Sequence, residues 1–130
     1  MCIRDRYKID PITFLLGRVL IALYFIGPGI FKIIDYSGYL SLMASKGVPL
    51  PEIALPITIF CQIALSVFII INKHLRISAL ILFVLTMLIN IFIHDFWNLG
   101  GDPSQAHETQ NFVKNLAIAA GLLVLSSKEK

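Results

Sequence analysis

The chain has 130 residues, of which 57% are hydrophobic and 15% are charged, and its formal net charge is +3. A soluble domain of this size usually carries more charge on its surface. Because four long stretches hold almost none of the charges, the composition favours a polytopic membrane protein over a soluble one. No basic stripe with interleaved aromatic residues is present, so we expect no nucleic-acid partner and expect contact with anionic lipid heads.

Four apolar stretches predict four membrane-spanning helices, since a spanning helix needs about 20 mostly apolar residues. The predicted helices cover 12–34, 53–72, 75–95 and 111–126. The first holds two charged residues, the second holds none, and the fourth is the shortest. The runs show no period-2 alternation, which disfavours a β-barrel. The predicted fold is therefore all-α, an integral membrane four-helix bundle that forms one domain over 1–130.

The first apolar stretch is interpreted as a permanent helix rather than a cleaved signal. The run is too long for a signal peptide, and no small-residue cleavage site follows it directly. Residues 1–6 resemble neither the helices nor the connections that follow, so no inference is based on Cys2.

Basic residues predict the orientation, because cytoplasmic segments carry excess Lys and Arg near helix ends. They gather at the N-terminal flank, between the second and third helices, and at the C-terminus, as Arg4, Arg6, Lys8, Lys73, Arg76, Lys128 and Lys130. The two longer connections, 35–52 and 95–110, balance their basic residues with acidic ones. We therefore expect both termini to be cytoplasmic and both longer connections to face outward.

Polar residues inside the apolar stretches are the candidates for function, since each is costly in hydrocarbon. The candidate pocket residues are Arg18, Lys32, Gln62, Asn90, His94, Lys114 and Asn115. Arg18 either extends its side chain to the inner headgroups or faces the bundle as a buried cation. Gln62 lies near the middle of the second helix, where an amide either joins helices or contacts a ligand.

The outer boundary of the bundle carries the other candidates. Asn90 and His94 are four residues apart and share one helix face. His94 is either an interfacial histidine satisfied by water or a loop carbonyl, or a ligand donor or proton carrier. Lys114 either extends outward to the headgroups or meets Asp95 or an anionic ligand. Lys32 likewise either extends outward or pairs with Asp35 or an anionic ligand. By depth alone, we expect these groups and the neighbouring asparagine of the fourth helix to line one outward-facing pocket.

Several catalytic chemistries find no matching residues. Cys61 has no second cysteine in the membrane for dithiol chemistry, and the histidines are not placed as a pair of haem ligands. His94, Asp95 and His107 are too loosely grouped in sequence to predict zinc, so no metal is expected. No phosphate loop or nucleophile motif is present, and no self-contained catalytic constellation is seen.

An ordered set of short motifs spans the chain from about Leu16 to Leu125. The set comprises Gly17-Arg18, Gly29, Phe31 and Lys32, then Gly47 to Pro51, then His94 with Phe96-Trp97-Asn98, then Phe112, Lys114 to Ala117, and Gly121 to Leu123. This combination resembles the DoxX family of small bacterial membrane proteins. The resemblance implies a four-helix bundle in the bacterial cytoplasmic membrane. Family members often carry a Glu in the middle of the second helix, where this chain has Gln62 and so lacks an ionisable group.

The resemblance also implies a function. The family is named for a subunit associated with thiosulfate oxidation coupled to quinone, and other relatives are linked to redox-stress complexes. An accessory subunit of a redox or quinone-linked membrane system is therefore expected, with quinone as a possible lipid-soluble ligand. One alternative is a non-catalytic assembly protein that packs against protein subunits through Gly17, Gly27, Gly29 and Gly121. The other is a small permease that must form a homo-oligomer.

Overall fold

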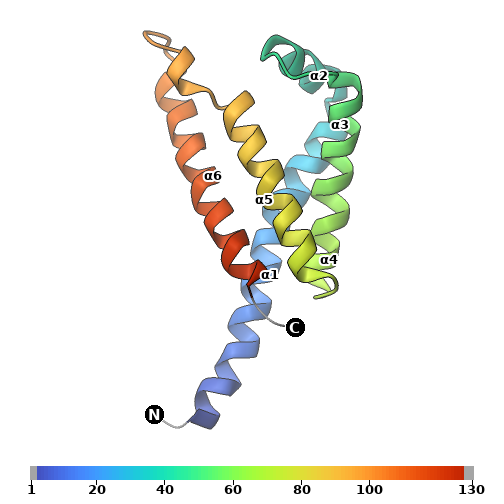
Figure 1. The fold of residues 1–130 in the computed structure, drawn as a ribbon, viewed down its shortest axis with the longest axis vertical. Coiled ribbons are helices and arrows are strands. Elements are labelled where there is room, and N and C mark those ends of the chain that lie inside the picture. The colour runs from blue at the N-terminus through green and yellow to red at the C-terminus, as the bar shows by residue number, and fades with distance from the viewer. Residues whose placement is uncertain (1–2, 128–130) are drawn as a thin grey trace.

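The computed structural model describes residues 3–127, with side chains described for 11–127. The described chain is helical, without strands. Its elements are α1 (Ile3–Ile34), α2 (Tyr36–Ser45), α3 (Pro51–Phe60), the π-helix η1 (Cys61–Leu65), α4 (Ser66–Ile70), α5 (Leu75–Phe92), the 3₁₀-helix η2 (Phe96–Asn98) and α6 (Gln105–Ser126). Since α3, η1 and α4 follow one another without a break, four helical columns stand side by side (Figure 1). The expected all-α four-helix bundle is confirmed.

Helix α1 begins at Ile3, nine residues before the expected start at 12, and two elements at the other end of the bundle also differ from the expected ranges. The connection 35–52, in which no helix was expected, contains the helix α2. Helix α6 begins at Gln105, six residues before the expected start at 111, and so brings a polar first turn into the bundle. Both differences lie at the end of the bundle that carries α2 and η2.

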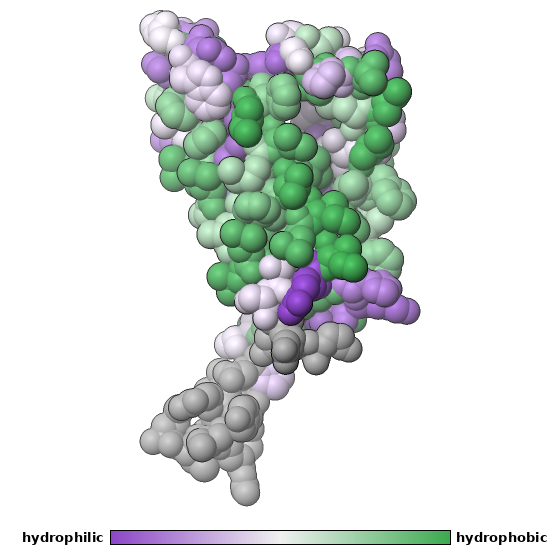
Figure 2. Space-filling view, in the orientation of Figure 1, coloured by the Kyte–Doolittle hydropathy of each residue, from purple (hydrophilic) through white to green (hydrophobic). Residues whose placement is uncertain are grey.

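Three helical segments are long and apolar enough to cross a bilayer. They are Pro11–Ile34, Pro51–Ile70 and Leu75–Asn98. Large apolar side chains stay exposed on each of them, for example Leu20, Phe60 and Val84. Figure 2 shows a hydrophobic band between two polar rims on the face in view. Exposed apolar surface of this extent is the expected property of a face that contacts lipid.

Helix α6 is not among those three segments. Its 22 residues would extend about 33 Å, which is enough to span the hydrocarbon region. It packs along α5 in the most extensive helix pair of the described chain (Figure 1). The fourth crossing stays a prediction, because the first turns of α6 are polar.

The bundle has two different ends (Figure 1). At one, here called the terminal end, α1 begins, α6 finishes and a tight reversal joins α4 to α5. Asn72 and His74 adopt positive φ values of 59° and 51° in that reversal. The other, the loop end, carries α2 and η2. The basic residues at positions 4, 6, 8, 128 and 130 that suggested the orientation lie outside the described side chains, so the cytoplasmic placement of the termini stays a prediction.

The two halves of the bundle are packed differently. The apolar core lies toward the terminal end and comprises Ala22, Phe25, Ile69, Leu75, Ala79, Leu82, Leu122 and Leu125. Buried polar side chains are present in both halves. Thr58, Gln62, Thr86, Asn90 and Asn115 lie in the middle and the loop-end half, and Arg18, Ser66, Ser78 and Ser126 lie closer to the terminal end. The contiguous apolar core therefore lies in the first half, where a hollow of about 230 Å³ also opens beside Arg18 and Gly121.

Candidate functional site

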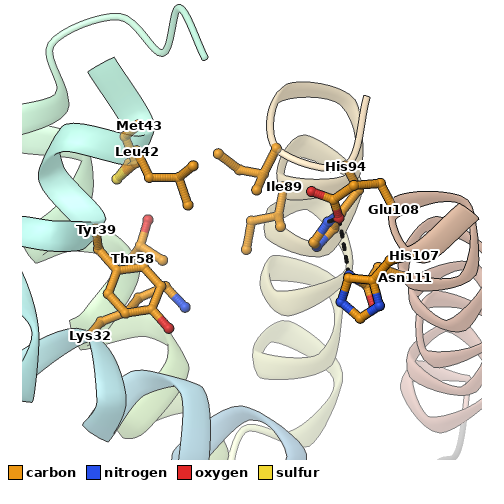
Figure 3. Close-up of a pocket in the computed structure, with 11 residues that line it drawn as sticks. Lys32, Tyr39, Leu42, Met43, Thr58, Ile89, His94, His107, Glu108 and Asn111 are labelled. Atoms are coloured by element: carbon orange, nitrogen blue, oxygen red, sulfur yellow. Dashed lines mark hydrogen bonds and ion pairs between the residues drawn. The ribbon is translucent and has the colours of Figure 1, made fainter. Parts of the chain in front are cut away.

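A hollow of about 340 Å³ opens between the helices at the loop end. It is called the loop-end cavity, and its lining comprises Lys32, Tyr39, Leu42, Met43, Thr58, Ile89, Ile93, His94, His107, Glu108 and Asn111. Figure 3 shows α1, α2 and α3 contributing one wall, with α5 and α6 contributing the opposite wall. A mainly apolar hollow with a few convergent polar groups is the usual form of a small-molecule site.

Lys32 supplies an ammonium group to the first wall. It lies in the last turn of α1, with Nζ 5.1 Å from the centre of the Tyr39 ring. This cation–π contact satisfies only one direction of a group that has three N–H donors. Within the described residues, Lys32 makes no ion pair and no hydrogen bond, including with the nearby Asp35. The cavity therefore holds an unpaired cation.

The opposite wall carries a carboxylate that is already occupied. The Nδ1 atom of His94 lies 2.9 Å from Oε1 of Glu108, and Nδ2 of Asn111 donates to the same oxygen at 3.0 Å. Burial raises the pKa of Glu108, but the hydrogen bonds from Asn111 and His94 and the His94 charge outweigh it, so the pKa lies below its ordinary value. Glu108 therefore contacts His94 and Asn111 and makes no ion pair with Lys32.

A smaller hollow of about 130 Å³ continues from the loop-end cavity toward the middle of the bundle. This lower cavity shares Lys32, Ile89 and His94 with the larger one and is also lined by Tyr24, Phe25, Pro28, Gln62, Thr86 and Asn115. The Tyr24 hydroxyl donates to Oδ1 of Asn115. Pro28 has no N–H to donate to the carbonyl of Tyr24, so α1 lacks one backbone hydrogen bond on this wall.

Gln62 lies in the lower cavity because the second helical column widens there. It belongs to the π-helix η1, a feature that often accompanies functional sites. Gly29 of α1 allows the close approach, since a Cβ at that position would lie 2.8 Å from Cγ1 of Ile63. The Gln62 side chain is 3% exposed, and its Oε1 has no hydrogen-bond partner among the described residues. A buried amide oxygen without a partner is costly, and Oδ1 of the nearby Asn90 also lacks one.

The structure brings four of the seven candidate residues into the joined cavities: Lys32, Gln62, His94 and Asn115. Asn90 is buried beside them, where its Nδ2 donates to the Phe112 carbonyl at 3.1 Å and joins α5 to α6. Lys114 is exposed on α6 and lines no cavity found here. Its possible partner Asp95 is instead paired with Lys46, at 2.8 Å.

Arg18 lies at the opposite end of the bundle. It is 8% exposed, and its Nη1 donates to the carbonyls of Ile69 and Ile70 at 3.3 and 3.2 Å. These carbonyls end α4. That of Ile69 also accepts from the Asn72 N–H at 3.2 Å, and the guanidinium completes the cap and faces the negative end of the helix dipole. The Phe14 ring lies 4.8 Å from the guanidinium carbon. This geometry ties α1 to α4 far from the loop-end cavity.

Several cavity residues were missed by sequence reasoning. Tyr39 and Glu108 lie in segments that had been treated as loops. Thr58 could have been found, because it precedes Gln62 by four residues and so shares its helix face. Tyr24 lies eight residues before Lys32, which places both on one face of α1 by the same periodicity.

Comparisons with known proteins agree with the fold. Residues 13–95 match the DoxX family model. The chain is 28% identical over 116 residues to inner membrane protein YphA of Escherichia coli strain K12, across 89% of this chain and 82% of that relative. No solved structure gives a significant match. With the three apolar helices, the similarity indicates a multi-pass protein of the inner membrane.

Proposed function

The chain belongs to the DoxX family of membrane proteins, and from this premise we propose that it is an accessory subunit of a redox or quinone-linked membrane system. In this proposal the joined cavities hold the head of a quinone-class molecule. The fold alone does not decide this, since one fold serves many functions. The proposal is therefore argued from the site.

The unpaired ammonium of Lys32 carries the proposal. A buried or half-buried cation is costly unless an acceptor meets it, and the carboxylate of Glu108 is held by His94 and Asn111. A quinone ring presents two carbonyl oxygens, which only accept hydrogen bonds. Lys32 can donate to one of them from the wall shared by both cavities. The larger volume, about 340 Å³, lies within the range of small-molecule sites.

The proposal also assigns a direction. The loop end would face outward, with both termini in the cytoplasm, so that the cavity opens near the outer headgroup level. The basic residues at both termini and in the α4–α5 connection support this orientation. Cysteine substitutions at exposed positions of α2 and of that connection, labelled with a reagent that does not cross the membrane, would test it in intact cells.

Fluorescence of Trp97 tests the binding. It is the only tryptophan of the chain, it lies at the loop end, and its ring contacts the Phe112 ring. Titration with a fully substituted benzoquinone should give saturable quenching in detergent micelles. Lys32→Met should weaken binding by about tenfold or more, because a hydrogen bond to a charged group contributes about 1.5–3 kcal/mol. Lys114→Met is the matched control and should bind as the wild type does.

Two results would contradict the proposed function. One is quenching that rises linearly with quinone and never saturates, in wild type and variant alike. The other is equal affinity in the wild type and in Lys32→Met, with Lys114→Met also equal.

The assembly alternative has one supporting observation. A Cβ added at Gly17 or Gly27 would meet no atom within 4 Å, so these glycines leave open surface on α1. Small residues at such positions allow another helix to approach closely. Gly29, by contrast, is used within the bundle. A protein subunit that co-purifies with wild type but not with Gly17→Leu, together with intact function in His94→Ala, would favour this alternative.

A further inference from the structure

An apolar groove runs along the bundle surface between α3 and α5. It consists of two hollows of about 290 and 390 Å³ that share Leu85 and Leu88. Ala54 of α3 lines the hollow nearer the loop end, and Cys61 and Leu80 line the other one. The two hollows together are called the α3–α5 groove. Its lining is apolar except for Thr58, which suits a hydrocarbon chain better than a polar ligand.

The α3–α5 groove joins the loop-end cavity. Thr58, Ile89 and Ile93 line both the cavity and the upper hollow of the groove, together with Met43. Thr58 marks the boundary between the two surroundings, and its hydroxyl makes no hydrogen bond to the described residues. A molecule that lies across this boundary has polar contacts on one side and aliphatic contacts on the other.

The direction of the groove follows from α5. This helix begins at the terminal end and finishes at the loop end (Figure 1), so Leu80 lies deeper in the bundle than Ile93. Their separation of 13 positions in the sequence corresponds to about 20 Å along the helix. The hydrocarbon core of a bilayer is about 30 Å thick. The groove therefore extends from the head site to well beyond the middle of the membrane.

We propose that the α3–α5 groove holds the hydrocarbon tail of a single-chain amphiphile whose hydrogen-bond-accepting head lies beside Lys32, and that this ligand enters sideways from the bilayer between α3 and α5. The inference rests on the proposed function for the nature of the head. What distinguishes this groove from other lipid-facing surface is that it continues into a cavity with an unpaired ammonium. A tail in the groove and a carbonyl at Lys32 satisfy both surfaces with one molecule.

Photolabelling of the reconstituted chain tests the inference. The probe is a fully substituted benzoquinone with a long alkyl tail and a diazirine at the tail end, in phosphatidylcholine vesicles. After irradiation, label should concentrate on Cys61 and on α5 residues such as Leu80 and Leu88. Excess unlabelled quinone of the same tail length should reduce it by about tenfold. Lys32→Met should lose the label, and Lys114→Met should keep it.

A blocked groove provides a second measurement. Ala54→Phe places a ring in the upper hollow without altering the polar cavity residues, and Ala117→Phe adds the same ring on an exposed position of α6 outside the cavities. Ala54→Phe should reduce groove labelling, and Ala117→Phe should not. Circular dichroism and the Trp97 titration with a tailless quinone verify that Ala54→Phe is folded. If it is not folded, the competition and Lys32→Met results decide the question alone.

Four outcomes would overturn the inference. Label spread evenly over exposed residues of α1 and α6 would mean that ordinary lipid contact explains it. Groove label that excess quinone does not reduce would have the same meaning. Crosslinks between two chains through the groove would show that a second copy occupies it. Saturable quenching of Trp97 without groove label would leave the proposed function standing and remove only the groove, whereas loss of both would remove both.

Discussion

Replacing Gly29 by alanine tests how closely α1 and the π-helix η1 approach each other. The added Cβ would lie 2.8 Å from Cγ1 and 3.3 Å from Cδ1 of Ile63. Carbon atoms in favourable contact are about 3.5–4.0 Å apart, so the overlap is about 1 Å. Overpacking of this kind costs about 1–3 kcal/mol, and alanine regains about 1 kcal/mol over glycine in a helix. We expect a net loss of about 1 kcal/mol in the free energy of unfolding.

The assay is reversible unfolding in mixed micelles, monitored by circular dichroism. Gly27→Ala on the same helix is the matched control, because a Cβ there meets no atom within 4 Å and should not lower stability. Ile63→Ala should relieve the overlap, so Gly29→Ala should be less costly in that background than in the wild type. Equal stability of the two glycine variants, or no coupling with Ile63, would refute the close approach of α1 and η1.

Three further predictions concern single side chains. Arg18→Met should lower the free energy of unfolding by about 2 kcal/mol, because the carbonyls at the end of α4 lose a charged donor. Arg76 is exposed and donates one hydrogen bond to the Ser126 carbonyl, so Arg76→Met should lower the free energy of unfolding by less in the same assay. Gln62→Leu should leave the free energy of unfolding unchanged or raise it, because the Gln62 amide oxygen has no partner among the described residues. The same variant should weaken quinone binding in the Trp97 titration. A large loss of stability would show that the amide is satisfied within the fold. The pKa of Glu108 is lowered, so the stability that its carboxylate contributes is present above the ordinary pKa of 4.5 and is lost as the pH falls below that value. Glu108→Gln should therefore reduce the loss of stability at acid pH in melting curves. The control Glu52→Gln should not reduce it.

The fold was largely predictable from the sequence because hydrophobicity directly determines membrane helices. Long apolar runs leave few alternatives once every backbone polar group must be satisfied within the segment. The π-helix around Gln62 was not predicted, because no local pattern marks it and its close contact with Gly29 is tertiary. Helix α2 was not predicted either, since Gly47, Pro49 and Pro51, which follow it, suggested a loop.

The site was predicted less completely than the fold. Depth in the membrane was enough to group Lys32, His94 and Asn115, which do line the joined cavities. Depth does not specify the direction around a helix axis, which is why Lys114 was grouped with them although it is exposed. The partner of His94 depended on α6 beginning early enough to include Glu108, and no residue pattern before Phe112 had indicated that.

The amount of lipid-soluble molecule that co-purifies with the chain tests the central claim most directly. Wild type, Lys32→Met and Lys114→Met would be extracted in the same mild detergent, and the organic extract of each would be quantified by mass spectrometry per mole of chain. We predict a quinone-class molecule in wild type and in Lys114→Met, and a strongly reduced amount in Lys32→Met. Equal amounts in all three preparations, or no such molecule in any of them, would contradict a head site beside Lys32.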